Sequence, residues 1–143
     1  MTTAKFWQIP YNNWRWSERC AVIPIQEEAF RTGRAVRPTT CLICGFVGIG
    51  KREGRWQIIA HLERYDRPLD FYSICRPCHN ALHGRFTNPA RWQRLLQRYP
   101  RPGKWYMLLS MNPASQLQPF EQTYARGLPE PVSVTQLQLP KED

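Results

Sequence analysis

Four of the five cysteines in this 143-residue chain fall in two Cys-x-x-Cys pairs, which is the spacing of a metal site. The pairs are Cys41 with Cys44 and Cys75 with Cys78. They are typical of a structural zinc ion, because zinc takes four thiolates in a tetrahedron and each pair offers two. Gly45 follows the first pair, where a tight knuckle turn favours glycine. A zinc ion bound by four thiolates binds no water, so this spacing predicts a structural role and not a catalytic one.

All three histidines lie within residues 55–86, around the second cysteine pair. His79 and His83 are four residues apart, so on a helix they project from one face and can bind one ion. If the strand expected to end at His61 lies against that helix, a third imidazole joins them in an open, partly hydrated site. Such a site on a basic protein suits the hydrolysis of a phosphodiester. Two alternatives remain, a second structural zinc on these histidines or a His79 that only caps the knuckle.

The stretch IIAHLERYDRPLDFYSICRPCHNALHGRF resembles the HNH endonuclease family, in its zinc-stabilised branch of phage and bacterial proteins with two Cys-x-x-Cys pairs. The resemblance covers residues 41–86. It implies a ββα-metal, treble-clef-like fold with a divalent ion such as Mg²⁺, Mn²⁺, Ni²⁺ or Zn²⁺ on the histidines. By position it implies that His61, His79 and His83 bind this ion. It also implies that Asp70 orients His61 or the hairpin, so that His61, Asp70 and His79 belong to the catalytic site.

Leu62 departs from the family, which has a histidine at this position as the general base. A leucine accepts no proton, and loss of a general base typically costs about 10²- to 10⁴-fold in rate. Three replacements are open: Glu63 is the base, the register slips so that His61 is the base, or a metal-bound hydroxide suffices. The remaining alternative is a catalytically inactive zinc protein that acts as a DNA-binding or protein-binding regulator.

The net charge of +9 is unevenly distributed along the chain. Residues 112–143 carry −2, from four acidic and two basic side chains, so residues 1–111 carry +11. Such a charge favours a polyanion, and nucleic acid, DNA foremost, is the expected partner. The arginines expected to contact phosphates are Arg76, Arg85, Arg91, Arg94 and Arg98. Together with the resemblance to the HNH family, this charge predicts an HNH-type nucleic-acid-binding protein, a metal-dependent DNA endonuclease with a weakened or altered general base.

The elements that must position these residues follow from local signals. Residues 1–40 form an aromatic and basic N-terminal extension, with a short helix expected to end near Gly33. Its tryptophans are expected to pack on the central module. Residues 41–86 form that zinc module, with a strand over about 56–61. A second strand end leads through a tight turn into a short helix that stops near Gly84.

Residues 87–111 begin with a basic helix, for which Asn88 is the expected N-cap, Pro89 the first helical residue and Pro100 the end. Its apolar face is formed by Trp92, Leu95, Leu96 and Tyr99. Its arginines form a second face that is either an ordinary solvated surface or a row of phosphate contacts. Residues 112–143 are rich in Pro and Gln and are expected to be extended or disordered. The predicted fold class is a small α+β module with N- and C-terminal extensions.

The remaining composition excludes several classes of protein. No apolar run approaches the roughly 18 to 20 residues needed to span a bilayer, and the N-terminus lacks the apolar core of a signal peptide. We therefore expect a cytoplasmic protein without a membrane partner. Cys20 is left outside the pairs and is expected to be a small buried apolar side chain. A protein partner, bound through the aromatic extension and the tail, is a further alternative.

Overall fold

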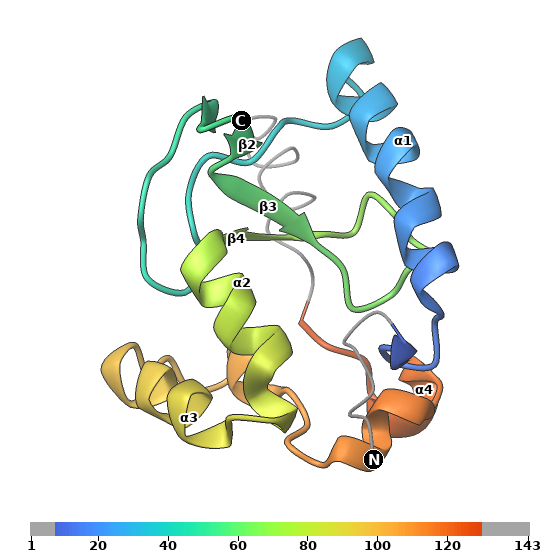
Figure 1. Ribbon diagram of the computed structural model, residues 1–143, viewed down its shortest axis with the longest axis vertical. Helices are drawn as coiled ribbons and strands as arrows, with labels where there is room; N and C mark the ends of the chain where they lie inside the picture. Colours follow the sequence, from blue (N-terminus) through green and yellow to red (C-terminus); the bar gives the residue numbers. More distant parts are fainter. Residues whose placement is uncertain (1–7, 130–143) are drawn as a thin grey trace, which may run out of the picture.

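The computed structural model describes residues 8–129, so the outer parts of the predicted segments 1–40 and 112–143 lie outside the described residues. The chain forms a mixed α+β fold (Figure 1). Its helices are α1 (Trp16–Thr32), α2 (Arg76–His83), α3 (Pro89–Arg98) and α4 (Phe120–Thr123). Its strands are β1 (Lys51–Arg52), β2 (Arg55–Trp56), β3 (Ile58–His61) and β4 (Tyr72–Cys75). The 3₁₀ turns η2 (Gly84–Phe86), η3 (Trp105–Leu108) and η4 (Pro113–Leu117) follow in the second half of the chain.

Two antiparallel strands and the helix that follows them form the centre of the molecule. β3 pairs with β4, with His61 opposite Tyr72 and Ile58 opposite Cys75. α2 begins directly after β4 because Cys75 is its N-cap, so the helix carries Cys78 in its first turn. The single strand predicted over 56–61 is divided at Gln57, since β2 pairs with β1 while β3 pairs with β4.

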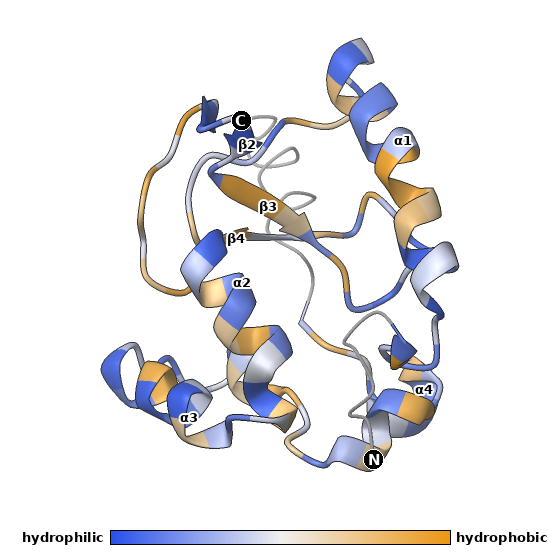
Figure 2. Ribbon diagram, viewed as in Figure 1, coloured by the Kyte–Doolittle hydropathy of each residue, from blue (hydrophilic) through white to orange (hydrophobic). Residues whose placement is uncertain are grey.

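Helix α1 is longer than expected and extends along one side of this centre (Figure 1). It begins after Arg15, whose backbone amide donates to the Glu18 carboxylate at 2.7 Å. It ends as predicted at Gly33, which adopts a φ of 81° that favours glycine. Figure 2 shows apolar residues along the middle of α1 and on β3.

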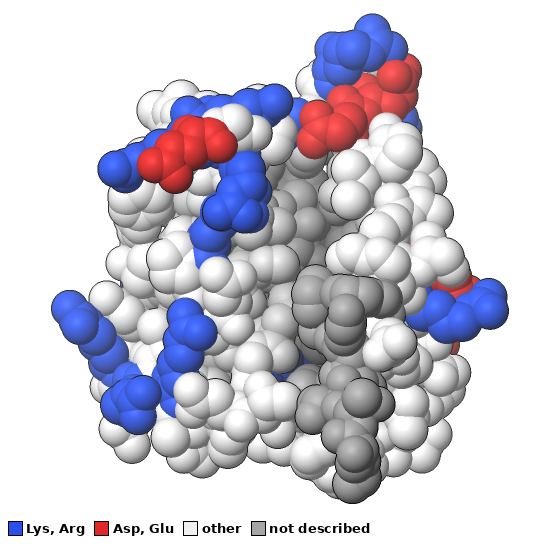
Figure 3. All heavy atoms as spheres, viewed as in Figure 1, with Lys and Arg blue, Asp and Glu red and all other residues white. Residues whose placement is uncertain are grey.

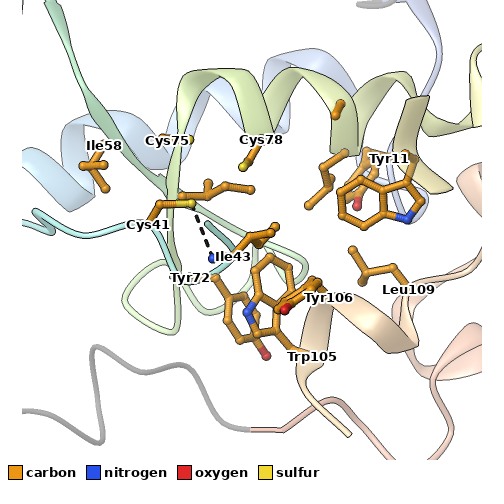
Figure 4. Packing of buried hydrophobic residues seen from close by; sticks show 14 of the residues in the cluster. Tyr11, Cys41, Ile43, Ile58, Tyr72, Cys75, Cys78, Trp105, Tyr106 and Leu109 are labelled. Carbon is orange, nitrogen blue, oxygen red and sulfur yellow. Dashed lines mark hydrogen bonds between the residues drawn. The ribbon is translucent and has the colours of Figure 1, made fainter. Parts of the chain in front are cut away.

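Most of the described chain shares one apolar core, which is drawn in Figure 4. It joins the β3–β4 hairpin and α2 to α3, whose Trp92 is 0% exposed. The predicted start of α3 is confirmed, because the Asn88 side chain accepts a hydrogen bond from the Arg91 amide. A second, smaller cluster lies under α1 and contains Val22, Ala29, Ala35, Leu62 and Phe71.

The expectation of an extended or disordered tail from residue 112 is wrong for its described part. η4 and α4 follow one another there, and Phe120 and Tyr124 are buried in the main core. The Tyr124 hydroxyl also accepts a hydrogen bond from the Ser110 amide at 2.9 Å. These two aromatic residues thus outweigh a proline- and glutamine-rich composition, because the segment adds to an existing core instead of forming its own. Residues 130–143 of the predicted tail lie outside the described part of the chain.

Candidate metal centres

The first candidate metal centre is built from a loop and the hairpin–helix junction. Cys41 and Cys44 lie in a knuckle in which Gly45, at a φ of 81°, donates its amide to the Cys41 carbonyl at 3.0 Å. The Ile43 amide points at the Cys41 sulfur at 3.4 Å, the contact drawn as a dashed line in Figure 4. Cys75 and Cys78 come from the end of β4 and the first turn of α2.

The four sulfur atoms are placed for one tetrahedral zinc ion. All four ligand atoms lie within 4.8 Å of one another, and the Cys44 and Cys75 sulfurs are 3.7 Å apart. Zinc–sulfur bonds of about 2.3 Å in a tetrahedron place sulfurs about 3.8 Å apart. Hydrogen bonds from Cys75 and Cys78 lower the pKa of Cys41, so the cluster already favours one thiolate. The predicted zinc site is therefore supported, whereas Cys20 is only half-buried and not the buried residue that was expected.

The second cluster contains every histidine of the chain. His61 ends β3, while His79 and His83 lie one turn apart on α2, and their ligand atoms lie within 4.8 Å of one another. The ring centroids of His79 and His83 are 4.5 Å apart, and His61 is 5.3 Å and 5.2 Å from them. Burial, with the nearby charges of His61 and Arg76, lowers the pKa of His79 to about 3. Neutral imidazole is the form that binds a metal.

Glu63 is the main partner of this cluster, and it is not an accessible base. Its carboxylate lies 2.6 Å from His61 Nε2 and accepts hydrogen bonds from the Tyr11 hydroxyl at 2.5 Å and the Asn12 amide at 3.0 Å. The side chain is 2% exposed. Burial raises the pKa of Glu63, but the hydrogen bond with His61 and the charge of Arg85 outweigh it and hold that pKa below its usual value. Glu63 thus fixes the His61 ring.

Asp70, which was expected to orient His61, lies elsewhere in the hairpin connection. It is half-buried, and its backbone amide donates to the Arg67 carbonyl at 3.0 Å. Within residues 8–129, no hydrogen bond joins it to His61. The orienting carboxylate is instead Glu63, which is two residues beyond His61 and therefore lies on the same side of the extended chain.

Arg85, expected to bind phosphate, is buried at 1% exposure and has a structural role. Its guanidinium donates to the Ser110 carbonyl at 2.7 Å, to the Leu82 carbonyl at 3.0 Å and to the Tyr11 hydroxyl at 3.1 Å. It therefore forms a network with Tyr11 and Glu63 behind the histidine cluster. This expectation was wrong because the helix turn at Gly84 directs Arg85 inward, which charge along the sequence does not show.

The other four arginines remain accessible to different degrees. Arg76 is half-buried and donates to the Trp56 carbonyl at 2.7 Å, while Arg91, Arg94 and Arg98 are exposed on α3. Figure 3 shows basic side chains over the side of the molecule that carries α3 and the β1–β2 hairpin. The α3 stripe is thus a surface feature, separate from the histidine cluster.

Three residues of the site were missed in the sequence. Tyr11 and Asn12 reach Glu63 from a turn in which Asn12 and Asn13 have φ of 49° and 70°. The Asn-Asn pair predicts a turn, but nothing in the spacing shows that this turn reaches residue 63. Arg19 lies on α1 and lines the same cleft as the histidines.

A cleft of about 830 Å³ separates α1 from β3 and α2. The three histidines line it, together with apolar and aromatic side chains of both walls. Arg19, Arg37 and Arg76 also line it, and Glu27 pairs with Arg37. The cleft therefore gives the histidine cluster an access route with a net positive lining.

Leu62, which stands where the resemblance led us to expect a histidine base, lies in the apolar cluster under α1 at 2% exposure. We expect a Leu62→His variant to gain no nuclease activity, although it restores the family pattern. Burying the imidazole there is expected to lower the free energy of unfolding by about 1–3 kcal/mol. Urea denaturation and a plasmid-nicking assay measure both effects. Leu62→Met, which conserves volume, is the control and should cost less than about 1.5 kcal/mol. Activation by Leu62→His would contradict this placement.

Comparison of the chain with protein-family models, curated proteins and solved structures finds no match. Within the described residues, no helix has both the length and the apolar character needed to cross a membrane. The structure thus supports a zinc-binding cysteine cluster in an α+β fold. It also places three histidines at one cleft, with the buried Glu63 carboxylate on His61.

Proposed function

We propose that this protein is a metal-dependent phosphodiesterase acting on nucleic acid, of the HNH type, with its reactive centre at His61, His79 and His83. The observation that carries this proposal is the histidine cluster itself: three ligand atoms within 4.8 Å of one another, lining a cleft. Three imidazoles leave a coordination position open, which is the arrangement of catalytic rather than structural zinc sites. A divalent metal, when bound there, supplies a Lewis acid that lowers the pKa of its water.

The chain's own residues support this chemistry by position. The Glu63 carboxylate contacts Nε2 of His61 and fixes the ring. Glu63 does not contact the other ring nitrogen, Nδ1. A carboxylate behind a metal-binding histidine typically sets its tautomer and raises its basicity. Glu63 is engaged by three side chains, so its role is to position His61 and not to accept a proton from substrate.

Basic side chains support a polyanionic substrate. Arg76 lies close enough to His79 to lower its pKa, and it lines the cleft. The exposed arginines of α3 add positive charge at the surface. Contacts of this kind position a nucleic-acid backbone without reading its sequence.

The test is cleavage of nucleic acid together with metal content. We expect the zinc-loaded protein to cut supercoiled plasmid or a labelled oligonucleotide with at least one of Mg²⁺, Mn²⁺, Ni²⁺ or additional Zn²⁺. His79→Ala should lower the rate by about 10²-fold or more, the scale of lost metal-site catalysis. Gln97→Ala, on the exposed part of α3, is the matched control and should cut normally. Metal analysis should give two ions per wild-type chain and one ion in a His79→Ala, His83→Ala double variant.

The second candidate function is a non-cutting regulator that binds nucleic acid or protein. Leu62 in the apolar cluster and the fully engaged Glu63 favour it, because neither residue can be a general base. Salt-dependent nucleic-acid binding without cleavage under any of the four metals would establish it in place of the nuclease.

A further inference from the structure

The histidine cluster lies too deep for the backbone of an intact duplex. His61 is 2% exposed, and His79 and His83 are half-buried. The Tyr11 ring packs on His83 at 4.7 Å, and the Trp105 ring stacks on His61 at 5.8 Å. The cleft beside α1 reaches all three rings, and its volume of about 830 Å³ is that of a small-ligand pocket. A paired duplex is thick enough to hold a whole α-helix in its major groove of about 12 Å, so the duplex as a body does not fit into such a space.

Arg19 gives this cleft a largely buried cation. The residue is 9% exposed and lines the cleft from α1, and the three histidines line the same cleft. One terminal nitrogen donates to the Ile9 carbonyl at 3.2 Å, and no carboxylate forms an ion pair with the guanidinium among residues 8–129. A buried guanidinium without a carboxylate partner favours an anion such as phosphate.

The remaining walls suit nucleobases. Trp16 is 42% exposed on α1, with the Arg19 guanidinium over its ring at 5.2 Å. Phe30, Tyr65 and Phe86 line the same cleft, with Ile23 between Trp16 and Phe30 along the helix. A positively charged groove with aromatic side chains is how proteins bind single strands, because bases stack on the rings while cations hold the phosphates.

We infer that the cleft accepts an unpaired strand of nucleic acid, with a backbone phosphate on Arg19 beside the histidine cluster. This inference rests on the proposed function and narrows its substrate from nucleic acid in general to a single strand or an unpaired region. The buried position of the histidines disfavours a duplex. The Arg19 guanidinium, which has no carboxylate partner among the described residues, favours a phosphate, and the aromatic walls favour unpaired bases.

The first test compares one labelled oligonucleotide as a single strand and annealed to its complement. We expect the single strand to be bound more tightly and cut faster by about tenfold or more. Equal cutting of both forms would overturn the inference and leave the proposed function standing. Preferred binding of the single strand without any cutting would support the inference and remove the proposed function. Equal binding of both forms, with or without cutting, would overturn the inference. A protein that binds inorganic phosphate but neither form of the oligonucleotide would also overturn it.

The second test changes the phosphate contact. Arg19→Gln should weaken binding of the single strand by about tenfold and reduce the salt dependence of log Kd by about 0.7, which corresponds to one phosphate contact. A purely structural role of Arg19 would leave the salt dependence unchanged, and that result would overturn the assignment. Arg126→Gln removes an exposed arginine that lies outside both the cleft and α3, and it is the matched control. If circular dichroism shows that Arg19→Gln is unfolded, Arg19→Lys is measured instead. It keeps the charge but loses the planar guanidinium with its several donors, so unaltered binding would contradict the proposed contact.

Discussion

Replacing Cys41 by serine is expected to abolish the folded state at ordinary temperature. Cys41 is 2% exposed, accepts the Ile43 amide on its sulfur and lies in the main core. A structural zinc site contributes about 10–16 kcal/mol of apparent binding free energy in small zinc modules, which is as large as the whole net stability of a typical domain. Serine offers a poor ligand, so most of that contribution is lost. Circular dichroism and zinc content measure the effect, and excess chelator should reproduce it in the wild type.

Cys20→Ser is the matched control for this experiment. Cys20 is half-buried on α1 and lies outside the four-cysteine cluster. We expect this variant to retain its zinc and its helical signal, with a change in unfolding free energy of about 1 kcal/mol or less. A Cys41→Ser protein that stays folded without zinc would show that the apolar core alone holds the module.

Replacing Glu63 by glutamine is expected to weaken both the fold and the histidine site. Glutamine keeps the shape but removes the negative charge that faces Arg85 through the Tyr11 hydroxyl. Loss of one partner of a buried charge pair typically costs about 3–5 kcal/mol. Loss of the carboxylate behind His61 should also lower metal affinity at the histidine cluster by about 10- to 100-fold. Urea denaturation and titration with Co²⁺ measure the two effects separately, and Glu121→Gln, at an exposed carboxylate, is the control.

The pH dependence of this variant has a defined sign. The pKa of Glu63 is lower in the folded chain than its usual value, so its contribution to stability is present at neutral pH and lost as the pH falls. The difference in stability between wild type and Glu63→Gln should therefore narrow below about pH 4, close to the usual pKa of a glutamate. If the difference in unfolding free energy between the two proteins stays constant from pH 7 to below pH 4, the Glu63 carboxylate is not held in its charged form.

Local signals predicted the parts of this fold that local backbone geometry controls. Gly33 ends α1 with a positive φ, Asn88 caps α3, and the knuckle at Gly45 has the expected turn. Each of these depends on a few neighbouring residues, so the sequence contains the needed information. The spacing of the cysteines likewise predicted which sulfurs meet, because each pair occupies one turn.

Contacts between distant segments were not predictable in the same way. Tyr11 and Glu63 are 52 residues apart, and Arg85 and Tyr11 are 74 residues apart, yet they form one buried network. Judged by charge alone, Arg85 and Arg91 are equal candidates for phosphate binding. In the fold Arg85 is buried, whereas Arg91 is exposed. The segment after residue 112 also becomes ordered through Phe120 and Tyr124, by packing on a core formed elsewhere.

The sequence by itself thus determined the composition of the two clusters, four cysteines and three histidines, because ligand type and spacing are local properties. The roles of the residues around these two clusters were decided only by the tertiary structure. It placed Leu62 under α1 and Glu63 on His61, and it buried Arg19 at the cleft without a carboxylate partner among the described residues. The physical reason is that burial and hydrogen bonding depend on which segments pack together, and this packing is settled only when the whole core forms.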